Sequence, residues 1–250
     1  MKKLGLFVNF QYDEVMFHLY KKRITDVIAA RCKNAPKLNI AALNIVPQGL
    51  RLENDDVYVS YSMFESYFHT SIEYAVNVEH CDVLAVAMYD TNLHNLAEEL
   101  FDELYSDVDA GNTCFVSAIN CAIAATQKHK RWHRLALLGM NFTPNDESTC
   151  KRFEAAGYEV VKLLDYDAVE NLSLRAADFI NNYEGPETAD LNSLRHICGE
   201  IETATKLAKI DALIVGAPEL DNVLTYGAVK TPRINLIDEH AHAIAEALLS

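Results

Sequence analysis

A group of polar residues follows an apolar segment in the first half of the chain. Residues 83–88, VLAVAM, have the composition of a buried strand, and Asp90, Thr91, Asn92 and His94 come directly after it, where a helical pattern begins. In open parallel α/β sheets, ligands bind beyond the carboxyl ends of the strands. A carboxylate, a hydroxyl, an amide and an imidazole at such a place are groups that exchange protons with a small ligand or bind it through hydrogen bonds.

Three roles of Asp90 are compatible with this position. It can act as a lone general base, although its ordinary pKa of about 4 suits a weakly acidic proton only if burial raises it. It can bind an ammonium or hydroxyl group of a ligand, or it can cap the following helix by accepting from the N–H groups of Asn92 or Leu93. His94 likewise has two interpretations, as a donor to a ligand or as an ordinary residue of the first helical turn.

Strands and helices alternate along the chain. The strands are apolar on both faces, which predicts an α/β protein whose parallel sheet is covered by helices on both sides. The expected strands are 3–8, 38–46, 81–88, 134–140, 158–164, 211–217 and 233–237, and the expected helices are 14–32, 64–80, 94–105, 114–130, 147–157, 193–209 and 239–249. His240 and His242, in the last helix, are interpreted as surface or packing residues, and contact with the cleft together with Asp238 is the alternative.

Two strand ends share one layout. Residues 81–96, CDVLAVAMYDTNLHNL, and residues 210–224, IDALIVGAPELDNVL, each contain an Asp, an apolar strand, a small polar cluster and then a helix or loop. This repeat predicts two lobes that face one cleft.

Composition narrows the class of protein. The chain has 250 residues, 50% of them hydrophobic, and a net charge of -14, so it repels nucleic acid and anionic membrane surfaces. No apolar stretch approaches the roughly 20 residues of a membrane span, and the first residues are interpreted as a strand, which predicts a cytoplasmic protein. The six cysteines form no C-x-x-C pair, so we expect reduced thiols and no metal site.

The two strand ends resemble those of the aspartate/glutamate racemase superfamily, which includes hydantoin racemases, maleate isomerases and arylmalonate decarboxylases. In that family one apolar strand ends in Cys-Asn-Thr-Ala-His and another ends in Leu-Gly-Cys-Thr-Glu. The corresponding residues here are Asp90-Thr91-Asn92-Leu93-His94 and Val215-Gly216-Ala217-Pro218-Glu219. Residues 135–161 and the closing segment INLIDEHAHAIAEALL are also similar to the family, with Thr143 at a ligand-contacting position.

The resemblance implies two pseudo-symmetric α/β lobes, a ligand cleft between them and a homodimer. The expected lobes are 1–112 plus 218–250 and 113–217. It also implies proton transfer next to a carboxylate without pyridoxal phosphate or another cofactor, on a small carboxylate or an amino acid. The expected catalytic residues are Asp90 and His94, and the expected substrate-binding residues are Asn9, Gln11, Thr91, Asn92, Thr143, Ala217, Pro218 and Glu219.

The chain departs from the family at the residues that carry its chemistry. Asp90 and Ala217 stand where the family has its two proton-transferring cysteines, and Pro218 offers neither a hydroxyl nor an N–H group. The two-thiol mechanism is therefore excluded on these residues. Three hypotheses remain. The first is a one-base isomerase or related lyase that uses Asp90, and the second is a non-catalytic descendant that binds a metabolite or serves as a scaffold. The third is an active racemase of the usual kind, in which other residues than these correspond to the two cysteines.

Overall fold

The computed structural model describes residues 2–9, 14–45, 61–88, 91–106, 111–139, 147–161, 163, 191–216, 218–226 and 229–250. The chain divides into two compact units. The first comprises residues 1–118 and 240–250, and the second is the continuous segment 119–239.

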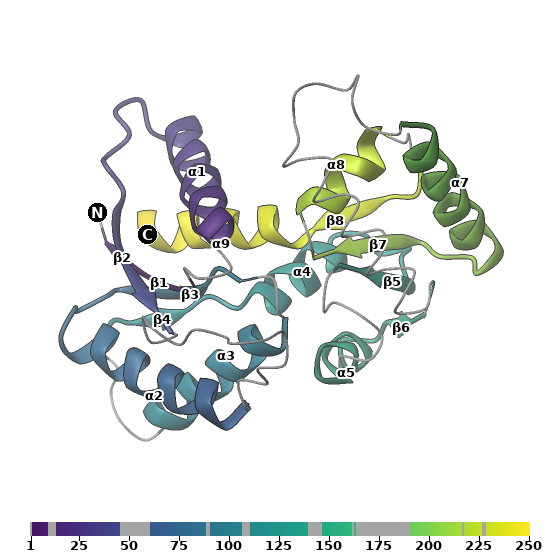
Figure 1. Cartoon of the computed structure of the whole chain (residues 1–250). Coiled ribbons are helices and arrows are strands. Elements are labelled where there is room, and N and C mark those ends of the chain that lie inside the picture. Colours follow the sequence, from purple (N-terminus) through teal and green to yellow (C-terminus); the bar gives the residue numbers. More distant parts are fainter. Residues whose placement is uncertain are drawn as a thin grey trace, which may run out of the picture. The chain divides into compact units, whose positions relative to one another are not determined.

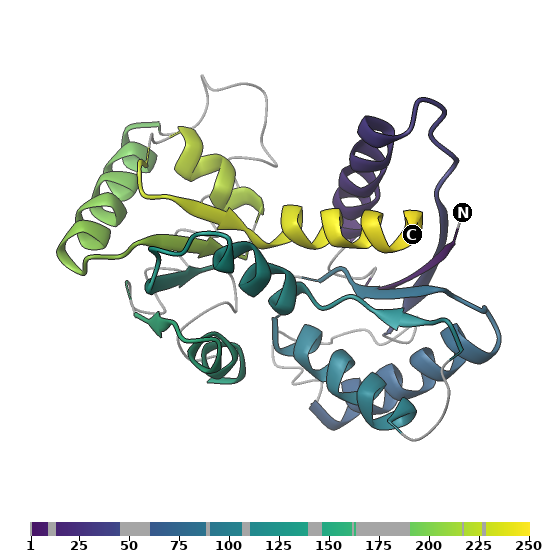
Figure 2. The ribbon, with the colours of Figure 1, turned by 180° about the vertical axis from the view of Figure 1, so that it is seen from behind.

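The first unit is a parallel sheet covered by helices on both faces. Its sheet has the order β2-β1-β3-β4. Helices α2 and α3 cover one face, and α1 and α9 cover the other (Figures 1 and 2). The elements are β1 (Lys3–Val8), α1 (Glu14–Arg31), β2 (Asn39–Asn44), α2 (Tyr61–Asn77), β3 (Val83–Val86), α3 (Thr91–Tyr105), β4 (Cys114–Phe115) and α9 (Leu236–Leu249), whose first residues lie in the second unit.

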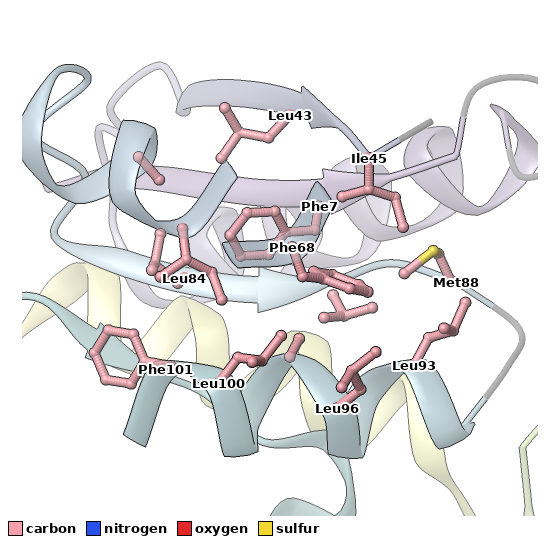
Figure 3. Packing of buried hydrophobic residues seen from close by; sticks show 14 of the residues in the cluster. Phe7, Leu43, Ile45, Phe68, Leu84, Met88, Leu93, Leu96, Leu100 and Phe101 are labelled. Carbon is pink, nitrogen blue, oxygen red and sulfur yellow. The ribbon is translucent and has the colours of Figure 1, made fainter. Parts of the chain in front are cut away.

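The core of the first unit lies between its sheet and helices α2 and α3 (Figure 3). Leu93, Leu96 and Leu100 recur at helical spacing, so α3 turns one apolar face toward the sheet. Phe7 of β1 and Phe68 of α2 meet edge to face, with ring centroids 5.7 Å apart.

Close packing at β1 requires a glycine. A Cβ atom on Gly5 would lie 2.6 Å from Leu84 Cδ2 and 3.0 Å from Cys81 Sγ. Because atoms of folded proteins do not approach so closely, any side chain at residue 5 displaces its neighbours in the core.

The second unit repeats this architecture. Its sheet has the order β6-β5-β7-β8 with parallel pairing throughout, and α7 and α8 pack on one face of it. Gly157, at a φ of 93°, ends α5 as a C′ residue, as its place in the sequence predicts. The elements are α4 (Ala118–Gln127), β5 (Arg134–Leu138), α5 (Glu147–Ala155), β6 (Glu159–Val160), α7 (Leu191–Leu207), β7 (Ala212–Val215), α8 (Pro218–Tyr226) and β8 (Arg233–Asn235).

The predicted α/β fold with two pseudo-symmetric lobes is therefore confirmed. Several element boundaries differ from the predicted ones, and two of the differences have a clear physical cause. Part of the predicted helix 114–130 is strand β4, since the Val116 N–H donates to the carbonyl of Leu84 at 2.8 Å. The predicted strand 233–237 ends at Asn235, whose side chain caps α9 by accepting from the N–H groups of Ile237 and Asp238.

The structure also divides the chain differently from the expected lobes. Residues 218–239, which the sequence analysis placed with the first lobe, lie in the second unit. The reason is β8, which pairs with β7 as the edge strand of the second sheet.

Candidate functional site

The carboxyl ends of β1 and β3 lie next to each other. Phe7 is paired with Val86, and the N–H of Ala87 donates to the carbonyl of Phe7 at 2.9 Å. Asn9 directly follows β1, and Ala87 and Met88 follow β3. The polar residues that follow β1 and β3 in the sequence therefore start from one edge of the sheet.

Buried polar residues gather at this carboxyl edge. Within the described part of the first unit, the buried Asn, His and Ser residues are Asn9, His94, Asn95, Ser117 and His240. Asn9 directly follows β1, and Ser117 is the second residue after β4. His94 and Asn95 lie in the first two turns of α3, and His240 lies on α9 and contacts Val116. Buried polar groups are costly unless they are hydrogen bonded, so this concentration marks the edge as a candidate site.

His94 lies in the first turn of α3 and is bonded to the end of β3. Its Nε2 atom is 2.9 Å from the carbonyl oxygen of Met88. Because a carbonyl only accepts, Nε2 carries the hydrogen, and a neutral ring then has its lone pair on Nδ1. Burial lowers the pKa of His94 to about 4, so the ring is neutral at pH 7.

His240 is fully buried and is bonded through both ring nitrogens. Nε2 donates to the carbonyl oxygen of Val116 at 2.8 Å, and Nδ1 accepts from the hydroxyl of Tyr20 at 2.9 Å. Burial and the neighbouring His94 lower the pKa of His240 to about 3. The ring centroids of His94 and His240 are 5.8 Å apart, in edge contact.

Ser117 connects the end of β4 to α3. Its hydroxyl donates to a carboxylate oxygen of Glu98 at 2.7 Å. Glu98 also acts electrostatically on His94, one helical turn earlier, and works against the effect of burial on the pKa of that ring. Buried polar residues thus follow each of the strands β1, β3 and β4 in the sequence, and they lie at one edge of the sheet.

The structure brings together some of the predicted site residues. Asn9 and His94 are buried at the carboxyl edge, Asn92 is half-buried on the first turn of α3, and Thr91 is the first residue of that helix. Pro218 and Glu219 begin α8 directly after β7, the equivalent place in the second unit. Asp90, Gln11, Thr143 and Ala217 lie outside the described residues, so their roles stay predictions.

Asn95 and Ser117 belong to this edge without having been predicted, and His240 was predicted as a surface or packing residue. The expectation of a packing residue is correct as to its burial but omits its hydrogen bonds. A signal was present in the spacing, because His240, Ile244 and Leu248 recur every four residues and all three are buried. A histidine on the apolar face of a helix needs partners for its two nitrogens, and here they come from α1 and from the residue after β4.

The cysteines lie away from this edge. Cys81 precedes β3 and is at its amino end, where burial raises the pKa of its thiol to about 11. Cys114, the first residue of the predicted helix 114–130, instead begins β4 and is exposed. Among the described residues, no His, Cys, Asp and Glu side chains form a group of three or more that could hold a metal ion.

No helix in the described part of the chain combines the length and the apolar character needed to cross a membrane. The predicted cytoplasmic location and the homodimer stay predictions.

The fold is that of known racemases. The chain is similar over its whole length to an aspartate racemase homologue from Pyrococcus horikoshii, with 17% sequence identity, 100% of both chains covered and a TM-score of 0.73. Glutamate racemase from Francisella tularensis, in complex with D-glutamate, is 10% identical over 99% of this chain and 81% of its own, with a TM-score of 0.63. A maleate isomerase from Pseudomonas putida is 16% identical over 99% and 92%, with a TM-score of 0.55.

No family model matches the sequence, and no curated protein is similar to it. At this level of identity the likeness is one of fold. The chain therefore has the two-lobed α/β fold of aspartate racemase, glutamate racemase and maleate isomerase.

Proposed function

We propose that this protein binds a small carboxylate or an amino acid at the carboxyl edge of its first sheet. The observation that carries the proposal is the concentration of buried polar side chains there, after β1 and β4, in the first two turns of α3 and on α9. The likeness in fold supports it, because two of the similar structures hold D-glutamate and maleate. Asn9, Gln11, Thr91, Asn92, Thr143 and Glu219 bind the ligand in this proposal.

The proposed reaction is proton transfer at the carbon next to the ligand carboxylate, with Asp90 as the single base. The carboxylate of Asp90 takes the α-proton, and the electron pair left on the carbon delocalises into the adjacent carboxylate group. The step is reversed when Asp90 returns a proton to the carbon. Such a step needs no cofactor to accept electrons. It requires general acid–base catalysis, which an aspartate can supply when its surroundings raise its pKa.

A single base has a stereochemical consequence. Ala217 takes the place of the second cysteine of the family and has no proton to deliver from the opposite face of the ligand. Asp90 then returns a solvent-derived proton to the face from which it removed one. We therefore expect exchange of the α-proton with solvent to be faster than inversion of configuration.

Solvent exchange tests this reaction. We expect L- or D-aspartate, glutamate or a related α-substituted acid to lose its α-proton signal in heavy water, by proton NMR, while its optical activity is kept. Asp90→Asn should abolish the exchange without lowering the melting temperature. Asp102→Asn, at an exposed residue of α3, is the matched control and should leave the exchange unchanged. Undiminished exchange in Asp90→Asn would contradict the assignment of Asp90 as the base.

A second candidate function is binding without catalysis, either of a metabolite or of a partner that uses the lobes as a scaffold. Ala217 and Pro218 favour it, because they replace a thiol and a hydroxyl that the family uses on its second strand end. A rise in melting temperature with a small acid, without α-proton exchange, would support this candidate against the enzyme. Exchange that depends on Asp90 would exclude it.

A further inference from the structure

The pair His94 and His240 carries an inference about which ligand group the proposed site accepts. His240 cannot rotate without breaking two hydrogen bonds, since Nε2 donates to Val116 and Nδ1 accepts from Tyr20. The carbonyl accepts only, so the tautomer of His240 is determined by its partners, and the Tyr20 hydroxyl is the donor. These three residues come from α9, from the segment after β4 and from α1.

The ring of His94 is in edge contact with the ring of His240. The two rings lie at 61° to each other with centroids 5.8 Å apart, and the Tyr20 ring contacts His240 at 5.4 Å. The Nε2–H group of His94 is used by the carbonyl of Met88. Within the described residues, no hydrogen bond involves His94 Nδ1, so its lone pair is the group that the ring has left to offer.

The surroundings of His94 disfavour a charge on its ring, because the effect of burial is larger than the opposing effect of the Glu98 carboxylate. Both nitrogens of His240 already have partners, so His240 has no free lone pair with which to stabilise an imidazolium beside it. Protonation of His240 itself would require the Tyr20 hydroxyl to turn from donor to acceptor. Burial disfavours a charge on either ring. Both imidazoles are therefore kept neutral by the same set of contacts.

We propose that His240 is a positioning residue that holds His94 as a neutral imidazole whose Nδ1 lone pair accepts a hydrogen bond from the ligand. The inference rests on the proposed function, and it narrows the ligand class. A neutral acceptor forms a hydrogen bond with a donor group of the ligand, but it forms none with a second carboxylate, which is itself an acceptor. The ligand at this edge therefore carries an ammonium or a hydroxyl group, as an amino acid does, and a simple dicarboxylate is disfavoured.

Nitrogen-15 spectra of the imidazole rings test the positioning part without any ligand. We expect both His94 and His240 to be neutral with hydrogen on Nε2 between pH 6 and pH 8. Tyr20→Phe removes the donor to His240 Nδ1 and keeps the ring, and it should shift the Nδ1 resonances of both histidines. A charged His94, hydrogen on its Nδ1, or a His94 resonance unmoved in folded Tyr20→Phe would overturn the proposal.

Calorimetry with aspartate and succinate tests the ligand part, because these two acids differ only in the ammonium group. We expect the wild type to bind aspartate at least about tenfold more tightly than succinate, and we expect Tyr20→Phe and His240→Gln to remove most of this preference. A purely structural role of His240 would lower the melting temperature and leave the ratio unchanged, which would overturn the proposal. His242→Gln, at an exposed residue two positions further on, is the control for substitution of a histidine on α9.

The two tests separate this inference from the proposed function. If no small acid binds the wild type, the proposed function fails together with the ligand part of the inference, while the ring spectra still decide whether His240 positions His94. If aspartate and succinate bind equally well, the proposed site stands and the role given to His94 is wrong.

Discussion

Asp82 and Asp211 occupy equivalent places in the two units. Asp82 precedes β3 and accepts the N–H of Lys3 at 2.7 Å, and Asp211 precedes β7 and accepts the N–H of Arg134 at 2.9 Å. Backbone hydrogen bonds join the same residues, because the N–H groups of Asp82 and Asp211 donate to the carbonyls of Lys3 and Arg134, both at 2.8 Å. Each aspartate thus connects the first residues of two neighbouring strands.

Removal of either carboxylate should destabilise the unit that contains it. Asp82→Ala leaves the N–H of Lys3 without its acceptor, and Asp211→Ala does the same to Arg134, so we expect a loss of about 1–3 kcal/mol in the free energy of unfolding in each case. Urea denaturation followed by hydrogen exchange of each sheet is the measurement. Asp102→Ala, at an exposed residue of α3, is the control. An unchanged unfolding midpoint for Asp82→Ala would show that the bond contributes nothing to stability.

Gly5→Ala should destabilise the first unit, since the new methyl group collides with Leu84 and Cys81. We expect a loss of about 1–3 kcal/mol, the usual effect of overpacking a core. Gly199→Ala is the matched control on α7, where a Cβ atom meets no other atom within 4 Å and the helix gains a better helix former. That variant should be stabilised by up to about 1 kcal/mol. Chemical denaturation measures both, and opposite signs are the expected result.

Acid should destabilise the first unit through its two buried histidines. Their pKa values are lowered to about 4 and about 3 in the folded state, whereas an unfolded histidine has a pKa of about 6.5. Between these values the unfolded chain binds more protons, so stability is fully present above about pH 6.5 and is lost as the pH falls toward 4. Each ring contributes up to about a tenfold change in the unfolding equilibrium per pH unit.

Denaturation midpoints at pH 7, 6 and 5 measure this dependence. Among the residues that the structure describes, the other titratable side chains that act on the two rings are Glu98, beside His94, and Tyr20, bonded to His240. A variant with both His94→Gln and His240→Gln removes the titrating rings and should have a shallower slope than the wild type. An equally steep slope would assign the acid sensitivity to carboxylates instead.

Thiol alkylation should leave ligand binding intact. Burial raises the pKa of the Cys81, Cys114 and Cys198 thiols, so none of these three is a reactive thiolate at neutral pH. Cys81 and Cys198 are also inaccessible to a reagent in the folded protein. We expect iodoacetamide at pH 7 to leave these two unmodified, by mass spectrometry, and binding of a small acid to be unchanged afterwards. Loss of binding on alkylation would show that a cysteine contributes to the ligand site.

Sequence patterns were sufficient for the elements that are long or apolar throughout. β1 was predicted at its observed bounds because a short apolar segment between polar residues has few alternatives, and the alternation of strands and helices indicated the fold. β4 was missed because its two residues stand in an apolar stretch that also fits a helix. The start of α9 was missed because the side chain of Asn235, and not hydrophobic periodicity, determines it.

The candidate site was predictable in part for a different reason. A polar residue after an apolar strand lies at the carboxyl edge whatever its partners are, so Asn9 and His94 could be selected from position alone. The interactions of His240 depend on Tyr20 and Val116, which are 220 and 124 residues away along the chain. Periodicity within one helix places His240 on the buried face but says nothing about what it meets there.

The discontinuity of the first unit has a consequence for the order of its maturation. During synthesis the chain leaves this unit after Ala118 and returns to it at His240, so the whole second unit is made in between. Helix α1 buries Tyr20, Ile24 and Ile28. The hydrogen bond from the Tyr20 hydroxyl to His240 forms only after α9 has been synthesised. The half of the protein that leaves the ribosome first is therefore completed last, and its nascent form is the stage most exposed to chaperones and proteases.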